Sequence, residues 1–270
     1  MKKLASAFVA LTLFIVVTSA YANTYTGSAQ SSVHKEAGVT LKASATFVVT
    51  NLQLVVTLSN TGTFDPRSTS DILTGVFFDF AGDPHLTPVS ATVAPSNSVI
   101  GLRHGLPLAF LGGDVNGEWA YKNDLAYPTA GDPTDNEGIS STKLKYFKKL
   151  DLFVPSGKIP GTSPLSGIQF GITTLDDLAS INKGSLKNKG LIESTVVFVF
   201  DLPSNFSGLT ADQISAEISD VNFQYGTSIK GGNDIAGEMV TQIPEPNTIA
   251  LVAAGLLGAF ALTGSRASRR

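Results

Sequence analysis

The sequence predicts a mainly β protein: a single β-sandwich domain of jelly-roll or Ig-like type, with an N-terminal signal helix and a C-terminal transmembrane helix. Three observations support this. The interior of the chain alternates apolar and polar residues with a period of two, which is typical of half-buried strands. Turn-forming residues separate these runs, as in sandwiches and barrels. Uncharged apolar stretches occur near both ends of the 270-residue chain.

The N-terminal region, 1–22, has the layout of a secretory signal peptide. Two lysines precede an uncharged apolar stretch at 4–18, and Ala20 and Ala22 form a small-x-small cleavage site. We therefore expect the cell's export machinery to be a partner. The mature chain should begin near Asn23, outside the cytoplasm.

The region 23–243 is the predicted β-sandwich domain. The run at 39–50 alternates over a dozen positions, and a second run at 52–58 follows after a short polar break, which predicts a hairpin. The run at 196–202 is almost entirely apolar, as expected for a strand covered on both faces. The other predicted strands contain Val76, Phe78 and Phe80; Val89, Ala91 and Val93; 146–153; and Val221, Phe223 and Tyr225.

One short helix is expected within 210–219. Thr210 is a candidate N-cap and Gln213 completes a capping box, while Ile214 and Ile218 are spaced to share one face. A loop over the same residues is the alternative. Two long loops are expected, at 112–138 and 156–166.

A membrane-spanning helix is predicted near the C-terminus. The uncharged stretch at 248–265 is long enough to cross a bilayer at about 1.5 Å per residue. Under the positive-inside rule, the arginines after it stay cytoplasmic and the domain before it lies outside. The flanking residues are Pro244, Glu245 and Pro246 before the span, and Arg266, Arg269 and Arg270 after it.

This arrangement resembles the PEP-CTERM sorting signal of exosortase-dependent bacterial surface proteins. The resemblance assigns 244–270 as the sorting signal, with the tripeptide marking the processing region and the arginines stopping transfer. It implies an exosortase as partner, transient anchoring in the inner membrane, and delivery to the surface or extracellular matrix of a Gram-negative bacterium. It also implies a structural or adhesive role associated with exopolysaccharide in a biofilm.

Composition excludes several classes of protein. The chain has no cysteine, which excludes disulfides, Cys-ligated metals and thiol nucleophiles. Of its 19 basic residues five lie in the two ends, whereas of its 22 acidic residues one does, so 23–243 has a net charge of −7. An acidic domain argues against a nucleic-acid partner. Because no GxSxG, P-loop or HExxH motif occurs, we expect the protein not to be an enzyme.

One loop has the composition of a ligand site. Asp114, Asn116 and Glu118 alternate directly before the aromatic residues Trp119 and Tyr121. A carbohydrate-binding module is therefore an alternative function, and a polysaccharide hydrolase, which needs paired carboxylates, is a second alternative. The competing interpretation is that the tryptophan belongs to the core, with its indole N–H bonded to a backbone carbonyl.

A second acidic loop contains Asp132, Asp135 and Glu137. Calcium prefers six to eight oxygen ligands from flexible, charge-rich loops, so these residues are calcium candidates and calcium is the one cofactor considered. The alternative is that Asp, Asn and Gly simply form turns in both loops.

Overall fold

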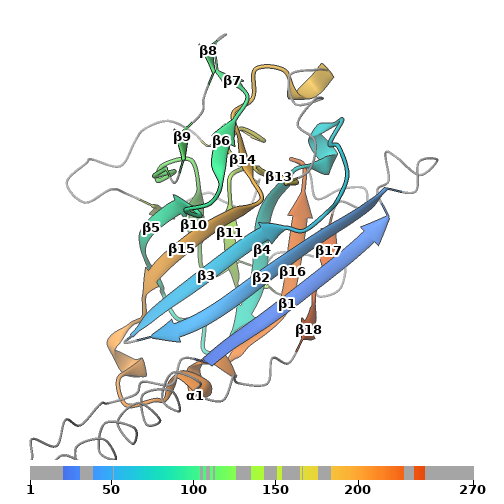
Figure 1. Ribbon diagram of the computed structural model, residues 1–270. Helices are drawn as coiled ribbons and strands as arrows, with labels where there is room; N and C mark the ends of the chain where they lie inside the picture. Colours follow the sequence, from blue (N-terminus) through green and yellow to red (C-terminus); the bar gives the residue numbers. More distant parts are fainter. Residues whose placement is uncertain are drawn as a thin grey trace, which may run out of the picture. The chain divides into compact units, whose positions relative to one another are not determined.

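The computed structural model describes residues 21–30, 39–50, 52–103, 106–107, 110–111, 113–125, 135–142, 151–153, 165, 167–175, 184–227 and 234–240. Two curled β-sheets pack over a shared core (Figure 1), which confirms the prediction of a mainly β protein. The jelly-roll or Ig-like type stays a prediction.

The front sheet, which faces the viewer in Figure 1, has six strands. All its neighbouring strands are antiparallel. In spatial order they are β18 (Glu238–Val240), β1 (Tyr21–Gln30), β2 (Thr40–Thr50), β3 (Gln53–Asn60), β15 (Thr195–Asp201) and β5 (Thr87–Val93).

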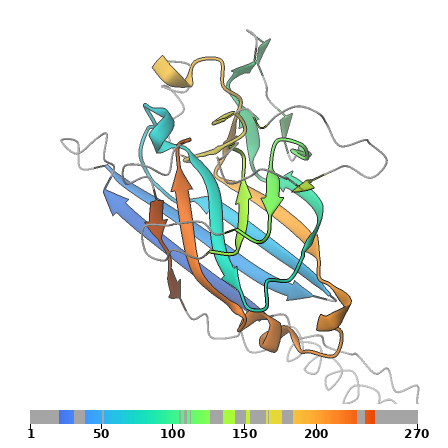
Figure 2. The same ribbon diagram turned by 180° about the vertical axis from the view of Figure 1, so that it is seen from behind.

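The back sheet is nearest the viewer in Figure 2 and has ten strands. Within this sheet, β4 pairs with β11 on one side and with β16 on the other. The strands are β12 (Asp151–Leu152), β10 (Ala120–Lys122), β11 (Glu137–Ser140), β4 (Leu73–Phe80), β13 (Ile172–Thr173), β14 (Leu191–Glu193), β6 (Ser98–Ile100), β9 (Phe110–Leu111), β16 (Ile218–Tyr225) and β17 (Asp234–Ala236). A separate pair consists of β7 (Leu102–Arg103) and β8 (Leu106–Pro107).

β2 and β3 form the predicted hairpin, with register partners from Ala43–Asn60 to Thr50–Gln53. The apolar side of each strand is buried and the polar side is half-buried or exposed. Leu52 is an exception to the predicted pattern. It is 38% exposed and has a φ of 62°, because it belongs to the turn and not to the strand.

The prediction that 196–202 is covered on both faces is wrong. Residues of β15 alternate between buried and half-buried, because the front sheet has the core on one side only. In the neighbouring β5, Val89 is 36% exposed although Ala91 and Val93 are buried. A register shift opposite Val199 and Phe200 places Val89 at a bulge.

The strand covered on both faces is β4, in which all residues except Asp79 are buried. Val76, Phe78 and Phe80 contribute to the core between the sheets, whereas Phe77 lies close to Gly138 and Leu125 on the outer face. The predicted long loop at 112–138 is therefore partly wrong: it contains β10 and the first residues of β11.

The predicted helix is present as α1 (Ala211–Ser215). The Gln213 N–H donates to Thr210 Oγ1 at 3.2 Å, and the Thr210 N–H donates to Gln213 Oε1 at 2.9 Å, which confirms the capping box. The helix is shorter than expected, because Ile218 begins β16. The described residues also form three short 3₁₀ turns, at Thr69–Asp71, Gly184–Leu186 and Ser204–Phe206.

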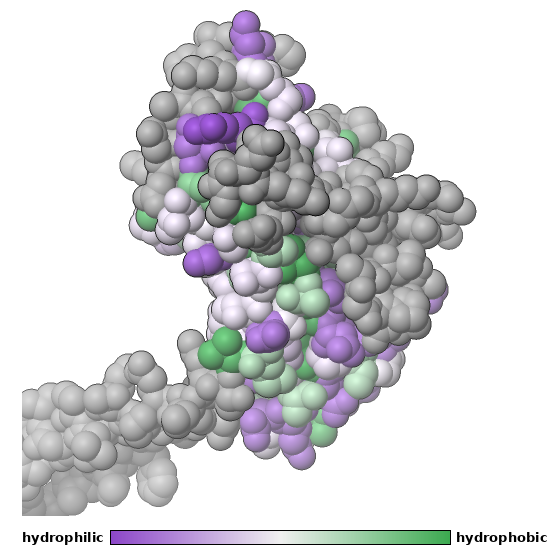
Figure 3. Space-filling model, turned by 90° about the vertical axis from the view of Figure 1, so that its right-hand side faces the viewer, coloured by the Kyte–Doolittle hydropathy of each residue, from purple (hydrophilic) through white to green (hydrophobic). Residues whose placement is uncertain are grey.

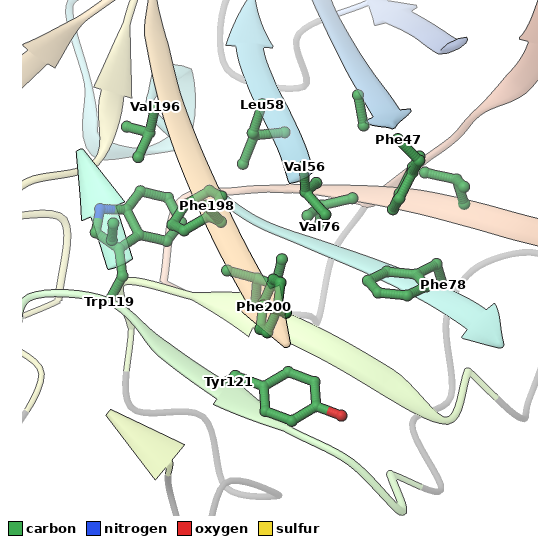
Figure 4. Packing of buried hydrophobic residues seen from close by; sticks show 14 of the residues in the cluster. Phe47, Val56, Leu58, Val76, Phe78, Trp119, Tyr121, Val196, Phe198 and Phe200 are labelled. Atoms are coloured by element: carbon green, nitrogen blue, oxygen red, sulfur yellow. The ribbon is translucent and has the colours of Figure 1, made fainter. Parts of the chain in front are cut away.

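Aromatic rings from both sheets meet in the core (Figure 4). Phe47 of β2 lies 5.0 Å from Phe78 of β4, centroid to centroid. Tyr121 of β10 and Trp119, which directly precedes β10, each lie 5.1 Å from a phenylalanine of β15, in the edge-to-face geometry that favours aromatic pairs. These contacts join the two sheets and explain why the interleaved polar residues of the strands face outward.

The chain passes between the sheets through single residues at two places. Ser194, with a φ of 62°, links β14 of the back sheet to β15 of the front sheet. Gly237 links β17 to β18, and its N–H donates to the Val221 carbonyl at 2.7 Å. A β-carbon at Gly237 would lie 2.7 Å from that same carbonyl oxygen, so the close approach requires glycine.

Candidate functional site

The predicted ligand loop runs along the edge of β5. The Val115 N–H donates to the Ala91 carbonyl at 2.9 Å, and Asn116 Oδ1 accepts from the Ala91 N–H at 2.5 Å. Asp114 is exposed and accepts from the Asn116 N–H at 2.8 Å, while Glu118 is half-buried. The bond between Asp114 and Asn116 is of the turn-forming kind expected of Asp, and the two bonds to Ala91 protect the edge of the front sheet.

The two aromatic residues of this loop are directed away from solvent. Trp119 and Tyr121 are both 0% exposed. Trp119 Nε1 donates to the Phe170 carbonyl at 3.1 Å, which confirms the core interpretation of the tryptophan. Since neither ring reaches the surface, neither can stack on a sugar from solvent in this structure.

The calcium candidates do not come together among the residues that the structure describes. Asp132 lies outside them. Asp135 is buried and its two carboxylate oxygens accept from Asn222 Nδ2 at 3.2 and 3.1 Å, whereas Glu137 contacts the Tyr121 hydroxyl. Within the described ranges, no group of three His, Cys, Asp or Glu residues is placed to hold a metal ion.

Glu137 lies inside the protein, where it is the register partner of Phe78 of β4. Burial raises the pKa of this carboxyl to about 9; the hydrogen bond with Tyr121 opposes the shift and nearby Asp83 adds to it. Burial and the adjacent Glu137 also raise the pKa of Tyr121 far above its ordinary value. A neutral acid bonded to a neutral phenol avoids the cost of a buried charge.

The Tyr121 hydroxyl connects this acid to the loop before β5. It accepts from the Leu86 N–H at 3.2 Å and lies 3.4 Å from the Pro84 carbonyl oxygen. Sequence reasoning placed Glu137 in a metal-binding loop and missed this pair. The only signal was the apolar Ile139 two residues later, which indicates that a strand has already begun.

A surface pocket of about 400 Å³ lies where β17 and β18 diverge beside β1. Hydroxyls of Thr26, Ser28 and Thr61 line it, together with the oppositely charged Lys42 and Glu238. These residues were not predicted, because four are ordinary polar residues of exposed strand faces and Thr61 directly follows β3. Figure 3 shows the side on the right of Figure 1, where hydrophilic and hydrophobic residues are interspersed.

The first and last described strands pair with each other. Thr24 of β1 is the register partner of Val240 of β18. Asn23, the predicted mature N-terminus, bonds through Nδ2 to the Ser215 carbonyl at 2.7 Å. Ala22, at the predicted cleavage site, pairs with Val48 within β1 and β2 of the uncleaved chain.

The remaining predicted processing residues lie outside the described part of the chain. They are Ala20, Pro244, Glu245, Pro246, Arg266, Arg269 and Arg270. The two predicted membrane helices also fall outside it, and no helix among the described residues is long and apolar enough to cross a membrane.

An exported β-domain followed at once by a proline-flanked apolar segment defines a class of protein that is sorted through the membrane. Comparison with protein families identifies the particular signal: residues 242–267 match the PEP-CTERM protein-sorting motif. The chain thus carries a PEP-CTERM sorting motif in its C-terminal region, and this motif indicates recognition by an exosortase and sorting to the cell surface. A comparison with curated proteins finds no match.

Proposed function

We propose that the protein is a non-enzymatic component of the exopolysaccharide matrix or outer surface of a Gram-negative bacterium, with a structural or adhesive role. The observation that carries the proposal is the sorting motif at 242–267, which begins two residues after β18 ends. An exosortase that removes this segment leaves the two-sheet domain as the mature protein. The signal peptide at 1–22 supplies the earlier export step.

Two carboxylates of the predicted acidic loop support a non-enzymatic role. Hydrolysis of a glycosidic bond generally needs two carboxyl groups that flank an accessible substrate. Asp135 is bonded to Asn222, and Glu137 is buried against Tyr121, so neither faces solvent. The pocket beside β1 has one carboxylate, that of Glu238, among its lining residues.

Fractionation of the producing bacterium tests the proposal. The protein should occur in the cell-surface and exopolysaccharide fractions, and deletion of the exosortase gene should shift it to the membrane fraction. Deletion of the gene for this protein should weaken the matrix or cell adhesion without changing the amount of polysaccharide. A matrix and adhesion equal to those of the parent strain would contradict the proposed role, whatever the fate of the sorting segment.

The pocket supports a second candidate, the binding of an acidic saccharide. Lys42 can pair with a carboxylate, while the hydroxyls and Glu238 can bond to sugar hydroxyls. Its volume lies within the range usual for small-ligand sites. Calorimetry with uronic-acid oligosaccharides should detect binding that Lys42→Ala abolishes and that Lys187→Ala, at an exposed lysine outside the pocket, leaves unchanged. Equal binding by both variants would refute this site.

A further inference from the structure

β18 is the strand closest to the sorting motif, and the structure holds it weakly. It pairs with β1 through three residues, Thr24, Tyr25 and Thr26, although β1 is ten residues long. All three residues of β18 are exposed. Glu238, the first residue of β18, also lines the surface pocket, so this end of the strand is open to solvent.

The core ends at β1 and does not extend to β18. Tyr25 and Met239 are register partners and therefore lie on the same face of the sheet. Tyr25 is 3% exposed, whereas Met239 is 51% exposed and Val240 is 47% exposed. Detachment of β18 would therefore uncover little apolar surface.

β1 itself is fixed independently of β18. The Tyr25 hydroxyl donates to the Ile218 carbonyl at 2.6 Å, and its ring packs against Phe47. β1 also pairs with β2 along its whole length, from Tyr21 to Gln30. The loss of β18 would leave this strand in place.

The segment between β18 and the sorting tripeptide, hereafter the linker, is short, so detachment of β18 would bring the tripeptide farther from the folded domain. Pro244 follows Val240 by four residues, which span at most about 14 Å when fully extended. With β18 paired, the folded domain therefore stays close to the tripeptide that a membrane-embedded enzyme has to reach. If the chain is released back to Gly237, which is anchored on Val221, the reach grows to about 24 Å.

We propose that β18 is a releasable strand: it leaves β1 while the exosortase processes the chain and pairs with β1 again in the mature protein. This inference rests on the proposed sorting. It makes residues 238–240 a positioning element for processing, because their pairing sets the distance between the folded domain and the cleaved segment. The rate at which the exosortase cleaves the chain therefore depends on how often β18 is detached from β1.

A disulfide lock tests the proposal, since the natural chain has no cysteine. Thr26 and Glu238 are register partners, and the separation of directly opposed residues suits a disulfide. The variant Thr26→Cys/Glu238→Cys should be processed at least tenfold more slowly when oxidised than when reduced, in cells that produce the exosortase. Intact mass spectrometry measures the fraction of chains that have lost the tail.

A matched lock controls for the effect of a disulfide as such. Ser59 and Thr195 are register partners on β3 and β15, with their hydroxyl oxygens 2.9 Å apart. Ser59→Cys/Thr195→Cys should be processed at the wild-type rate in both redox states. Processing of the oxidised β18 lock at the wild-type rate would overturn the proposal.

A longer linker tests whether processing is limited by the distance between the folded domain and the tripeptide or by recognition of β18 by the enzyme. Insertion of six Gly and Ser residues after Val240 should restore processing of the oxidised β18 lock, because the motif then reaches the enzyme without strand release. If the insertion fails to restore it, the enzyme requires β18 for another reason and the proposal is wrong. Failure of the wild-type chain to be processed would instead refute the sorting function itself.

Discussion

Replacement of Glu137 by glutamine should remove a large pH dependence from the stability of the domain. The carboxyl has a pKa of about 9 in the folded protein and about 4.3 in an unfolded chain. Between these values the folded state holds a proton that the unfolded state has lost. The stability supplied by this group is therefore fully present below about pH 4 and declines as the pH rises toward the folded pKa.

The size of this effect follows from how steeply the unfolding free energy changes with pH. One proton of difference changes the unfolding free energy by about 1.4 kcal/mol per pH unit, which gives a loss of about 4 kcal/mol from pH 5 to pH 8. Glutamine keeps the shape and can bond to the Tyr121 hydroxyl, but it does not ionise. Glu137→Gln should therefore be more stable than the wild type at pH 8, by an amount that shrinks as the pH is lowered.

Urea denaturation at pH 5, 6, 7 and 8 measures this difference. Glu217→Gln, at an exposed glutamate, is the control and should follow the wild type at every pH. If Glu137→Gln kept the wild-type pH slope, Glu137 would be ionised or hydrated in the folded protein, and the description of a neutral acid in the core would be refuted.

Three further changes should destabilise the domain, each measurable by urea denaturation followed by circular dichroism. Trp119→Ala removes a fully buried ring and should cost about 3–5 kcal/mol; a cost below 1 would mean that the ring is not in the core. Thr210→Ala removes the cap of α1 and should cost about 0.5–2 kcal/mol, whereas an unchanged stability would contradict the cap. Gly138→Ala places a β-carbon 2.6 Å from Leu125 and 2.8 Å from Phe77 and should cost about 1–3 kcal/mol; a neutral effect would contradict this packing.

Strands with one buried face were predictable from local patterns. Buried and less buried residues alternate along β2 and β3, because each strand has the core on one side and solvent on the other. The period of two in the sequence indicates this arrangement. The cap at Thr210 was predictable for a similar reason, since a capping box involves residues only three apart.

Tertiary contacts decided the cases that local patterns predicted wrongly. VVFVFDL is apolar enough for a doubly covered strand, yet β15 lies in a sheet with one buried face. β4 is buried on both faces because distant residues, among them Leu125 and Gly138, cover its outer side. A single sequence does not report which residues far along the chain will pack there.

The candidate sites show the same limit. Asp114 and Asn116 have the composition of a ligand loop, but their hydrogen bonds are within the loop and to the edge of β5. The pocket beside β1 combines Lys42 with Glu238, which are almost two hundred residues apart in sequence and come together only through the pairing of β1 with β2 and β18. The sorting signal, by contrast, is a contiguous motif and was fully readable from the sequence.

The mass of the mature protein tests the central claim most directly. Intact mass spectrometry of protein purified from the surface or matrix of exosortase-producing cells should show a chain that begins at Asn23 and ends near Pro244–Pro246. The same measurement in cells without the exosortase should show the C-terminal segment retained. Surface protein that still carries Arg270 in the presence of the enzyme would contradict exosortase-dependent sorting of this chain.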